Sequence, residues 1–257
     1  MQGEGAEGES VNADSSNGPS FIPHEVLWDD GKISRYWDHL SQVPTALDNC
    51  WSKQAGKALV RYVTRKRPLQ GRILDYGCGP GFLVADLLEI AGTAVVYGVE
   101  HSPESVRLVN SRFQGHQRFG GVLPAATIPT GYATGYFDTV FFVETIEHLQ
   151  ANFRLTAVKE LKRLLRSGGM VVVTTPNEEN MESSKAICPD CGARFHVVQH
   201  LSSWSAETLR ALMEEVGFKT VSCSPAYLRS KGTVLAAIAD RILRRRLPHL
   251  IYLGITL

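Results

Sequence analysis

The 257-residue sequence lacks the features that mark membrane proteins, secreted disulfide scaffolds and strongly charged chains. Its apolar runs fall short of the roughly 20 residues that span a bilayer, and the opening stretch MQGEGAEGESVNADSSNGPS contains no apolar signal segment. The five cysteines are too few and too scattered for a disulfide framework, which favours a reducing compartment. The formal charge of +1 provides no global field that would attract nucleic acid or anionic lipid. These absences predict a cytoplasmic, soluble enzyme without a membrane partner.

The hydrophobic pattern divides the chain into three parts. Residues 1–20 show no apolar periodicity and are expected to be a disordered tail. Residues 21–70 contain two amphipathic helical patterns. From residue 71 onward, apolar strands alternate with helices, and this order predicts a parallel sheet covered on both faces. One helix, ANFRLTAVKELKRLLRSGG, is expected to be closed by its terminal glycines.

The apolar C-terminal octet LIYLGITL permits more than one interpretation. It resembles a short membrane anchor or a tail that binds a partner. Its strand length and β-branched content favour a final strand of the sheet instead.

A glycine-rich turn follows the first apolar strand, in the segment LDYGCGPG. Gly77, Gly79 and Gly81 lie between a strand and a helix, where the backbone can approach a ligand and free N–H groups are available. Glu100 ends the next strand about 20 residues later, where a carboxylate can accept hydrogen bonds from both hydroxyls of a ribose. The two features together predict a nucleotide-like cofactor. They do not choose among cofactors, although the glycine spacing departs from the G-x-G-x-x-G of dinucleotide-binding folds.

The segment ILDYGCGPG resembles the first motif of class I S-adenosylmethionine-dependent methyltransferases, and the resemblance covers about residues 71–220. It implies a Rossmann-like sheet of seven strands, the last antiparallel, with the N-terminal helices as a lid over the cofactor. It also implies that Asp75, Gly77 and Gly79 lie beside the methionine part, within a binding loop that includes Cys78 and Gly81, and that Glu100 holds the ribose. Many relatives carry an Asp near the end of the third strand for adenine, but FGGVLPAATIP contains no acid.

Two carboxylates and a histidine follow a later strand in the segment FDTVFFVETIEHL. A turn or short helix there would bring Glu144, Glu147 and His148 to one side, at the carboxyl end of the sheet. Such a set suits Mg²⁺, Mn²⁺, Fe²⁺ or Zn²⁺. The alternative is a solvated first helical turn whose acids complement the helix dipole.

The E-x-x-E-H pattern resembles two branches of the family, the ubiquinone-pathway O-methyltransferases and the small-RNA 2′-O-methyltransferases. That resemblance implies a divalent-metal site completed by a later histidine, here His200 in HLSSWSAETL. A cation that binds two adjacent substrate oxygens would lower the pKa of one and align it with the methyl group. His148 or His200 acting as general base is the alternative.

The stretch CPDCGARFHVVQH has the spacing of a zinc knuckle, with Cys188, Cys191, His196 and His200 as candidate ligands. If His200 belongs to the catalytic metal, the zinc candidates are Cys188, Cys191 and His196. Three interpretations stay open: a Cys2His2 knuckle, a shared arrangement, or a turn that binds no metal. In each of them, residues 181–204 form an insert that overhangs the cofactor cleft and shapes the acceptor pocket.

Aromatic and basic clusters carry weaker signals. Trp28, Tyr36 and Trp37 recur at helical spacing, which is more typical of packing than of substrate contact. The basic clusters favour solvated helix faces over RNA contact; they are Arg61, Arg65, Lys66 and Arg67, and, on a helix expected over about 231–246, Arg241, Arg244, Arg245 and Arg246.

The sequence therefore predicts an S-adenosylmethionine-dependent O-methyltransferase of a hydroxylated small molecule or sugar, assisted by a divalent cation such as Mg²⁺. One alternative is 2′-O-methylation of RNA 3′ ends, and another is a non-catalytic binding subunit with a zinc knuckle. N- or C-methylation also stays open, because the cofactor half does not specify the acceptor. The acceptor, the metal and the oligomeric state are not specified by the sequence.

Overall fold

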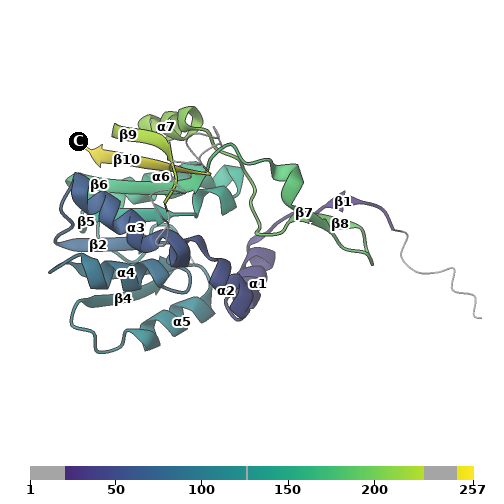
Figure 1. The fold of residues 1–257 in the computed structure, drawn as a ribbon, viewed down its shortest axis with the longest axis horizontal. Coiled ribbons are helices and arrows are strands. Elements are labelled where there is room, and N and C mark those ends of the chain that lie inside the picture. Colours follow the sequence, from purple (N-terminus) through teal and green to yellow (C-terminus); the bar gives the residue numbers. More distant parts are fainter. Residues whose placement is uncertain (1–20, 126, 229–247) are drawn as a thin grey trace, which may run out of the picture.

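The computed structural model describes residues 21–125, 127–228 and 248–257, and its body is a seven-stranded sheet between two layers of helices (Figure 1). The strand order is β4-β3-β2-β5-β6-β10-β9. The strands are β2 (Arg72–Tyr76), β3 (Val95–Glu100), β4 (Phe119–Pro124), β5 (Phe137–Val143), β6 (Leu165–Pro176), β9 (Phe218–Ala226) and β10 (His249–Thr256). The strands β2 to β6 pair in parallel, whereas β10 runs antiparallel to both β6 and β9. The predicted fold class is therefore confirmed.

Alternation along the strands distributes apolar side chains to two cores. Ile73 and Phe141 belong to the core beneath α3 and α4, whereas their neighbours Leu74 and Phe142 belong to the core beneath α6 and α7. This alternation follows from the two-residue period of a β-strand. The helices of the described residues are α1 (Asp30–Leu40), α2 (Pro44–Asn49), α3 (Trp51–Lys66), α4 (Phe82–Ile90), α5 (Pro103–Arg112), α6 (Ala151–Leu164), α7 (Ala206–Glu215) and the 3₁₀ turns η1 (Ile146–His148) and η2 (Met181–Ser184).

The C-terminal segment is an interior strand of the sheet. The strand β10 lies between β6 and β9, and its residues 250–253 are almost completely buried. The prediction of a final strand is thus correct, and the anchor and tail alternatives are excluded. No helix in the described parts of the chain has the length and apolar character needed to cross a membrane.

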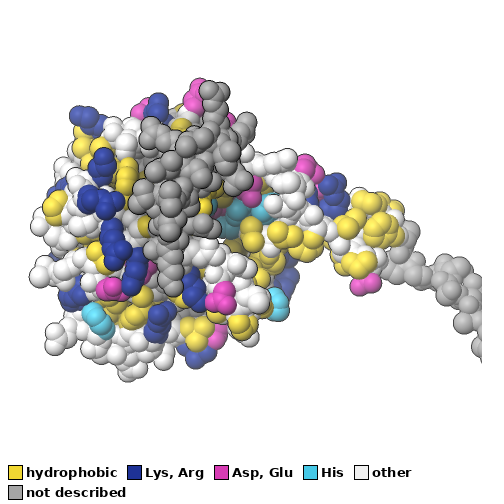
Figure 2. All heavy atoms as spheres, in the orientation of Figure 1, with side chains coloured by type: hydrophobic (Ala, Val, Ile, Leu, Met, Phe, Trp, Pro, Cys, Tyr) yellow, Lys and Arg dark blue, Asp and Glu magenta, His cyan; other side chains and the backbone are white. Residues whose placement is uncertain are grey.

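A second, three-stranded sheet forms an arm that projects from the body (Figure 1). Its strands are β1 (His24–Glu25), β7 (Lys185–Ile187) and β8 (Ala193–His196). The strands β7 and β8 form a hairpin, and β1 pairs in parallel with β8, so His24 and Glu25 are joined to residues 169 positions further along the chain. Hydrophobic side chains are exposed along this arm (Figure 2), among them Ile22 and Ile187.

One predicted helix end is wrong. The helix α6 ends at Leu164 and the chain enters β6 directly, so Gly168 and Gly169 lie inside the strand rather than at a helix cap. The pairing register between β5 and β6 shifts at this point, between Phe137 and Thr139. Gly168 has a φ of +68°, a conformation that glycine adopts readily, and β6 gains three residues over β5 across this shift. The glycines therefore bend a strand instead of ending a helix.

Other local predictions meet different outcomes. Ser102 caps α5 as expected, because its side chain accepts a hydrogen bond from the Ser105 amide. The predicted disordered tail 1–20 and the basic helix at about 231–246 lie outside the described residues. The division into a lid of 21–70, a domain of 71–257 and an insert of 181–204 stays a prediction.

The buried position of β10 leads to a stability prediction. We expect Leu250→Ala to lower the free energy of unfolding by about 2–5 kcal/mol, because the Leu250 side chain is 0% exposed and its removal leaves a cavity. Leu257→Ala is the matched control, since that leucine is 83% exposed, and it should change the free energy by less than about 0.5 kcal/mol. Urea unfolding followed by circular dichroism measures both. Equal unfolding midpoints for the two variants would contradict an interior β10.

Candidate active site

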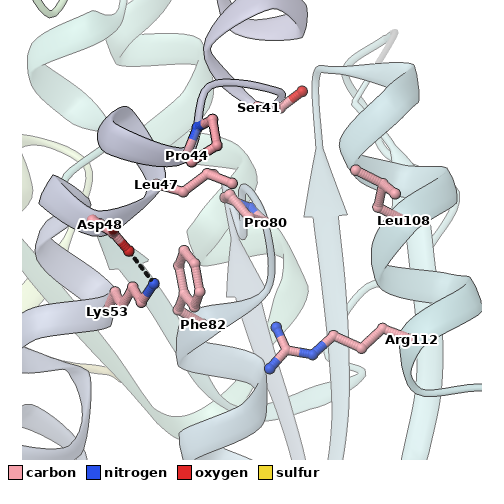
Figure 3. Close-up of a pocket in the computed structure, with 9 residues that line it drawn as sticks. All are labelled: Ser41, Pro44, Leu47, Asp48, Lys53, Pro80, Phe82, Leu108 and Arg112. Carbon is pink, nitrogen blue, oxygen red and sulfur yellow. Dashed lines mark hydrogen bonds and ion pairs between the residues drawn. The ribbon is translucent and has the colours of Figure 1, made fainter.

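A cavity of about 1330 Å³ lies at the carboxyl ends of the parallel strands, where ligands bind in open α/β sheets. It is lined by residues 76–80 after β2, 99–101 after β3, 143–145 after β5 and 176–179 after β6. The helices α1 and α2 and the base of the arm complete the wall. A smaller hollow of about 440 Å³ adjoins it behind Pro80, and there Lys53 pairs with Asp48 beside the Phe82 ring (Figure 3).

The loop after β2 is shaped by glycines. Gly77 has a φ of +82°, and a Cβ atom at this position would lie 2.6 Å from Thr145 Oγ1. Gly79 has a φ of +49°, yet a Cβ there would meet no atom within 4 Å. Gly77 is therefore required by packing as well as by backbone conformation, whereas Gly79 exposes its backbone to open space beside the cavity. The glycine turn thus lies between β2 and α4 as expected, and its role in cofactor binding stays a prediction.

Glu100 fastens this loop to the end of β3. Its Oε2 accepts a hydrogen bond from the Gly79 amide at 2.7 Å, and its Oε1 accepts one from the Ser102 amide at 2.9 Å. Burial raises the pKa of Glu100, and the backbone N–H donors oppose that rise. The side chain also lines the cavity, so its remaining lone pairs are available to a ligand.

Asp75 lies behind the loop and is 2% exposed. Burial, and then the charge of Glu100, raise the pKa of Asp75 to about 8. Its Oδ2 has no hydrogen-bond partner. A buried carboxyl oxygen without a partner costs free energy, so it marks a place where a ligand can donate.

Cys78 contributes backbone rather than sulfur chemistry. Its side chain belongs to the apolar core, and burial raises the pKa of the thiol well above its ordinary value. The Cys78 amide donates to the Val99 carbonyl, which holds the loop against β3. Gly81 precedes α4 in a left-handed conformation and, with a Cβ, would collide with Val109.

The predicted metal cluster is partly assembled. Glu147, His148 and His200 each offer a ligand atom within 4.8 Å of those of the other two. Glu147 Oε1 is completely buried and has no hydrogen-bond partner, while Thr175 donates to Oε2 at 3.0 Å. Histidine side chains gather where the arm meets the body (Figure 2).

The surroundings of Glu147 and His148 disfavour the charged form of each side chain when no cation is bound. Burial, and then the charge of Glu144, raise the pKa of Glu147 well above its ordinary value. Burial, and then His200, lower the pKa of His148 to about 3. Both shifts favour neutral groups, so an ion pair does not explain the 4.0 Å approach of His148 Nε2 to Glu147 Oε1. A cation would favour the ionised form of Glu147, and a carboxylate beside a neutral imidazole is a donor set that divalent cations accept.

Glu144 does not join this cluster. It precedes η1 with a φ of +47°, so it is not the start of the short helix that was expected to align it with Glu147. Its carboxylate accepts a hydrogen bond from Thr174 Oγ1 at 2.8 Å and lies 3.4 Å from His249 Nε2. The predicted set of four is thus reduced to three, with Glu144 on the adjoining wall of the cavity.

The zinc candidates are separated in the structure. Cys188 and Cys191 lie at the turn of the β7–β8 hairpin, whereas His196 ends β8 and joins Glu179 and His200. Within the described residues, neither group of potential metal ligands includes a cysteine. Hydrogen bonds from the backbone of Cys191 and Asp190 lower the pKa of Cys188, as in a tight turn around a sulfur. Zinc binding at this turn stays a prediction.

Two residues of the site escaped the sequence analysis. Glu179 follows β6 in the segment PNEEN, and its position after a buried strand was the available signal. Gln199 is completely buried with a φ of +56°. It accepts a hydrogen bond from Trp37 Nε1 at 2.9 Å and donates to the His148 carbonyl at 3.1 Å. Nothing in the local pattern around Gln199 indicated these contacts.

The N-terminal aromatic residues pack as the sequence favoured, and they also border the cavity. Trp28 and Tyr36 meet edge to face, and Tyr36 donates to the Val197 carbonyl at 2.5 Å. Trp37 lines the cavity and lies edge to face with His148 at 4.9 Å between ring centroids. The helix α1 is therefore attached both to the arm and to the histidine cluster.

Comparison with known proteins places these features in context. A family model described as a methyltransferase domain matches residues 50–223. Malonyl-[acyl-carrier protein] O-methyltransferase of Legionella pneumophila is 29% identical over 48% of this chain and 42% of its own. Ubiquinone biosynthesis O-methyltransferase of Nitrosococcus oceani is 25% identical over 60% of this chain and 62% of its own. The matched segments span about half the length of these relatives.

The fold has solved counterparts as well. The structure of 1,6-didemethyltoxoflavin-N1-methyltransferase from Burkholderia thailandensis, solved with S-adenosylhomocysteine, superposes with a TM-score of 0.61. The alignment covers 98% of this chain and 99% of that chain at 15% identity. At this identity the likeness concerns the fold alone.

The pKa of Asp75 leads to a prediction about pH. An acid whose pKa rises from 3.8 to about 8 on folding binds a proton in the folded state between those values. Its contribution to stability is complete below pH ~4 and is lost as the pH rises through about 8. Between pH 5 and pH 8, the unfolding free energy of the unchanged protein should fall because of Asp75. In Asp75→Asn we expect this fall to be smaller by at least about 1 kcal/mol. Urea titrations at both pH values measure this difference, with a substitution of an exposed acid, Asp190→Asn, as the control. If the unfolding free energies of all three proteins changed equally with pH, the raised pKa of Asp75 would be refuted.

Proposed function

Because the chain belongs to the methyltransferase-domain family, we propose that it methylates an oxygen of a hydroxylated small molecule or sugar, using S-adenosylmethionine and a divalent cation. The observation that carries this proposal is that one cavity has two chemically different sides. The glycine loop and Glu100 line one side, and His148 and His200 line the other. A cofactor and an acceptor can therefore meet in the same enclosed space.

The residues of the first wall fit the cofactor. Gly79 presents open backbone, Glu100 is held by two backbone amides with lone pairs to spare, and Asp75 Oδ2 has no partner. Glu100 is suited to the ribose hydroxyls and Asp75 to the amino group. Near the adenine-binding position expected after β4, the cavity is lined by Ala125, Thr127 and Ile128, none of them acidic. When bound, S-adenosylmethionine would supply a sulfonium methyl group to an oxygen nucleophile, with the methyl C–S bond breaking as the O–C bond forms and S-adenosylhomocysteine leaving.

The second wall fits a divalent cation. Glu147 Oε1 is buried without a partner, and the pKa shift of His148 keeps its imidazole neutral. Together with His200 they form a carboxylate and two imidazoles, a donor set that suits Mg²⁺, Mn²⁺, Fe²⁺ or Zn²⁺. A cation held there would lower the pKa of a substrate hydroxyl and hold it in place. An oxygen acceptor also agrees with the names of the two O-methyltransferases that the chain resembles.

The lining of the cavity favours an uncharged acceptor over RNA. Five carboxylates line it, and no lysine or arginine is found among its described lining residues. Nucleic-acid sites need basic residues against the phosphates. The basic residues of α3 do not provide them, because Arg65 and Lys66 lie in the last turn of that helix while its first turn borders the cavity.

The cofactor assignment is tested by Glu100→Gln. An amide has one acceptor oxygen, so it cannot accept from both the Gly79 and Ser102 amides and still serve a ribose. We expect S-adenosylmethionine to bind at least about 10-fold more weakly, the equivalent of one hydrogen bond to a charged group. Isothermal titration calorimetry measures the affinity, with Glu104→Gln, on the next helix and paired with Arg107, as the matched control. If the unchanged protein bound neither the cofactor nor its demethylated product, the proposed function would fail.

The cation is tested by Glu147→Gln. Catechol and cis-diol acceptors are screened with labelled cofactor, with and without a chelator, and the best acceptor is carried forward. We expect the substitution to lower kcat about 100-fold or more, because the ligand set loses its only buried carboxylate. Cofactor affinity should not change, since the described hydrogen bonds of Glu147 join it to Thr175, Leu201 and Ser202 and not to the glycine loop. Turnover that is insensitive both to the substitution and to chelation would remove the cation from the proposal while leaving methyl transfer intact.

A further inference from the structure

We propose that Glu179 is a positioning residue for His200. It holds the proton of the His200 ring on Nδ1, so that the other ring nitrogen, Nε2, is left to bind the cation. This inference rests on the cation of the proposed function. Glu179 and His196 were not part of the predicted catalytic set, yet both contact His200. Their role follows from the partners of each ring nitrogen.

His200 has a carboxylate directly behind it. Its Nδ1 lies 2.5 Å from Glu179 Oε2, and because the lowered pKa of Glu179 keeps it an ionised carboxylate that can only accept, Nδ1 is the donor. With that proton on Nδ1, the neutral imidazole carries its lone pair on Nε2. Nε2 is then the nitrogen available to an ion shared with Glu147 and His148.

His148 shows the same arrangement with a different partner. Its Nδ1 lies 3.3 Å from the Gln199 carbonyl oxygen, which can only accept a hydrogen bond. With Nδ1 as the donor to Gln199, the lone pair of His148 is on Nε2, which lies 4.0 Å from Glu147 Oε1, while the Glu144 backbone also contacts this ring. Both imidazoles thus have an acceptor at Nδ1, and both offer a ligand atom within 4.8 Å of one from Glu147. In metal sites, such outer partners fix the tautomer and strengthen the ligand.

The competing interpretation is a second ion, because Glu179, His196 and His200 also place ligand atoms within 4.8 Å of one another. The surroundings of His196 decide against it. Its Nδ1 faces the backbone amides of His200 and Val198 at 3.3 and 3.4 Å, so Nδ1 accepts and the proton is on Nε2. A protonated nitrogen cannot ligate a cation.

His196 instead supports the carboxylate. Its Nε2 lies 3.3 Å from Glu179 Oε1, in an electrostatic contact that is not aligned as a hydrogen bond. Its ring stacks on His200 with centroids 4.6 Å apart and planes inclined by 13°. The two oxygens of Glu179 therefore contact two parallel imidazoles. His200 is the proposed ligand of the cation, and His196 holds the Glu179 carboxylate in place.

The experiment is a cobalt titration of the unchanged protein and of variants made in a Cys188→Ser, Cys191→Ser background, where the hairpin thiols cannot bind the metal. In that background Glu179→Gln is compared with Glu182→Gln, a nearby exposed acid that pairs with Lys185 and Arg194. Visible absorption reports the coordination of Co²⁺, and calorimetry reports affinity and stoichiometry. Cofactor affinity, measured on the same samples, confirms that each variant is folded.

We expect one Co²⁺ in the histidine cluster of each chain and a 10- to 100-fold weaker affinity in Glu179→Gln, with the stoichiometry, cofactor affinity and the Glu182→Gln control unchanged. Two ions per chain, one of them lost in Glu179→Gln, would show that Glu179 is a ligand and overturn the proposal. Equal Co²⁺ affinities in Glu179→Gln and the control would overturn it as well.

The histidine tautomers give an independent readout. Long-range ¹H–¹⁵N spectra should show His200 protonated at Nδ1 in the unchanged protein and a loss of that preference in Glu179→Gln. If no Co²⁺ binds at all, the cation of the proposed function fails, and the tautomer spectrum still decides the role of Glu179. A proton on Nε2 of His200 would overturn the positioning role.

Discussion

The hydrogen bond from the Gly79 amide to the Glu100 carboxylate joins the two loops on which the cavity depends. It runs from the turn after β2 to the end of β3 and measures 2.7 Å. Only a residue without a Cβ adopts this loop conformation readily, and only a carboxylate can accept from the Gly79 and Ser102 amides at once. Ser102 also caps α5 and donates to Asp38 in α1, so the end of β3 contacts a helix that lines the cavity.

The opposite wall depends on one strained residue. Gln199 is completely buried in a left-handed conformation, which costs about 1–3 kcal/mol for a residue other than glycine. Its carbonyl accepts from His148, its amide donates to the His148 carbonyl, and its side-chain oxygen accepts from Trp37. The strain is therefore offset by hydrogen bonds that hold three separate segments around the metal candidates. Glu144 and Glu178 have the same backbone conformation, and both border the cavity.

The sequence predicted those parts of the protein that depend on local patterns. Strand alternation and the glycine turn sufficed for the sheet, for β10 and for the loop that carries Gly77 and Gly79. The pattern did not foresee the backbone at Glu144, which has a left-handed φ and lies outside the group formed by Glu147, His148 and His200. It also failed where distant pairing decides. His196 reaches Glu179 because the β7–β8 hairpin pairs it with Lys185, and a slip of one residue would turn it to the other face. A Cys-x2-Cys spacing contains no information about that register.

The charge distribution connects the two walls. Asp75, Glu100 and Glu147 are all buried, and burial raises the pKa of each. Glu100 lines the cavity, whose described lining residues include no lysine or arginine, while Asp75 and Glu147 lie outside that lining. Such an arrangement is costly in an empty cavity and favourable around positive ligands. A sulfonium nucleoside at one wall and a divalent cation at the other would provide that charge, each beside a buried carboxyl oxygen that has no partner, Asp75 Oδ2 and Glu147 Oε1. An acceptor bound between them then needs no charge of its own, because the hydroxyl is oriented by the cation and not by a basic side chain.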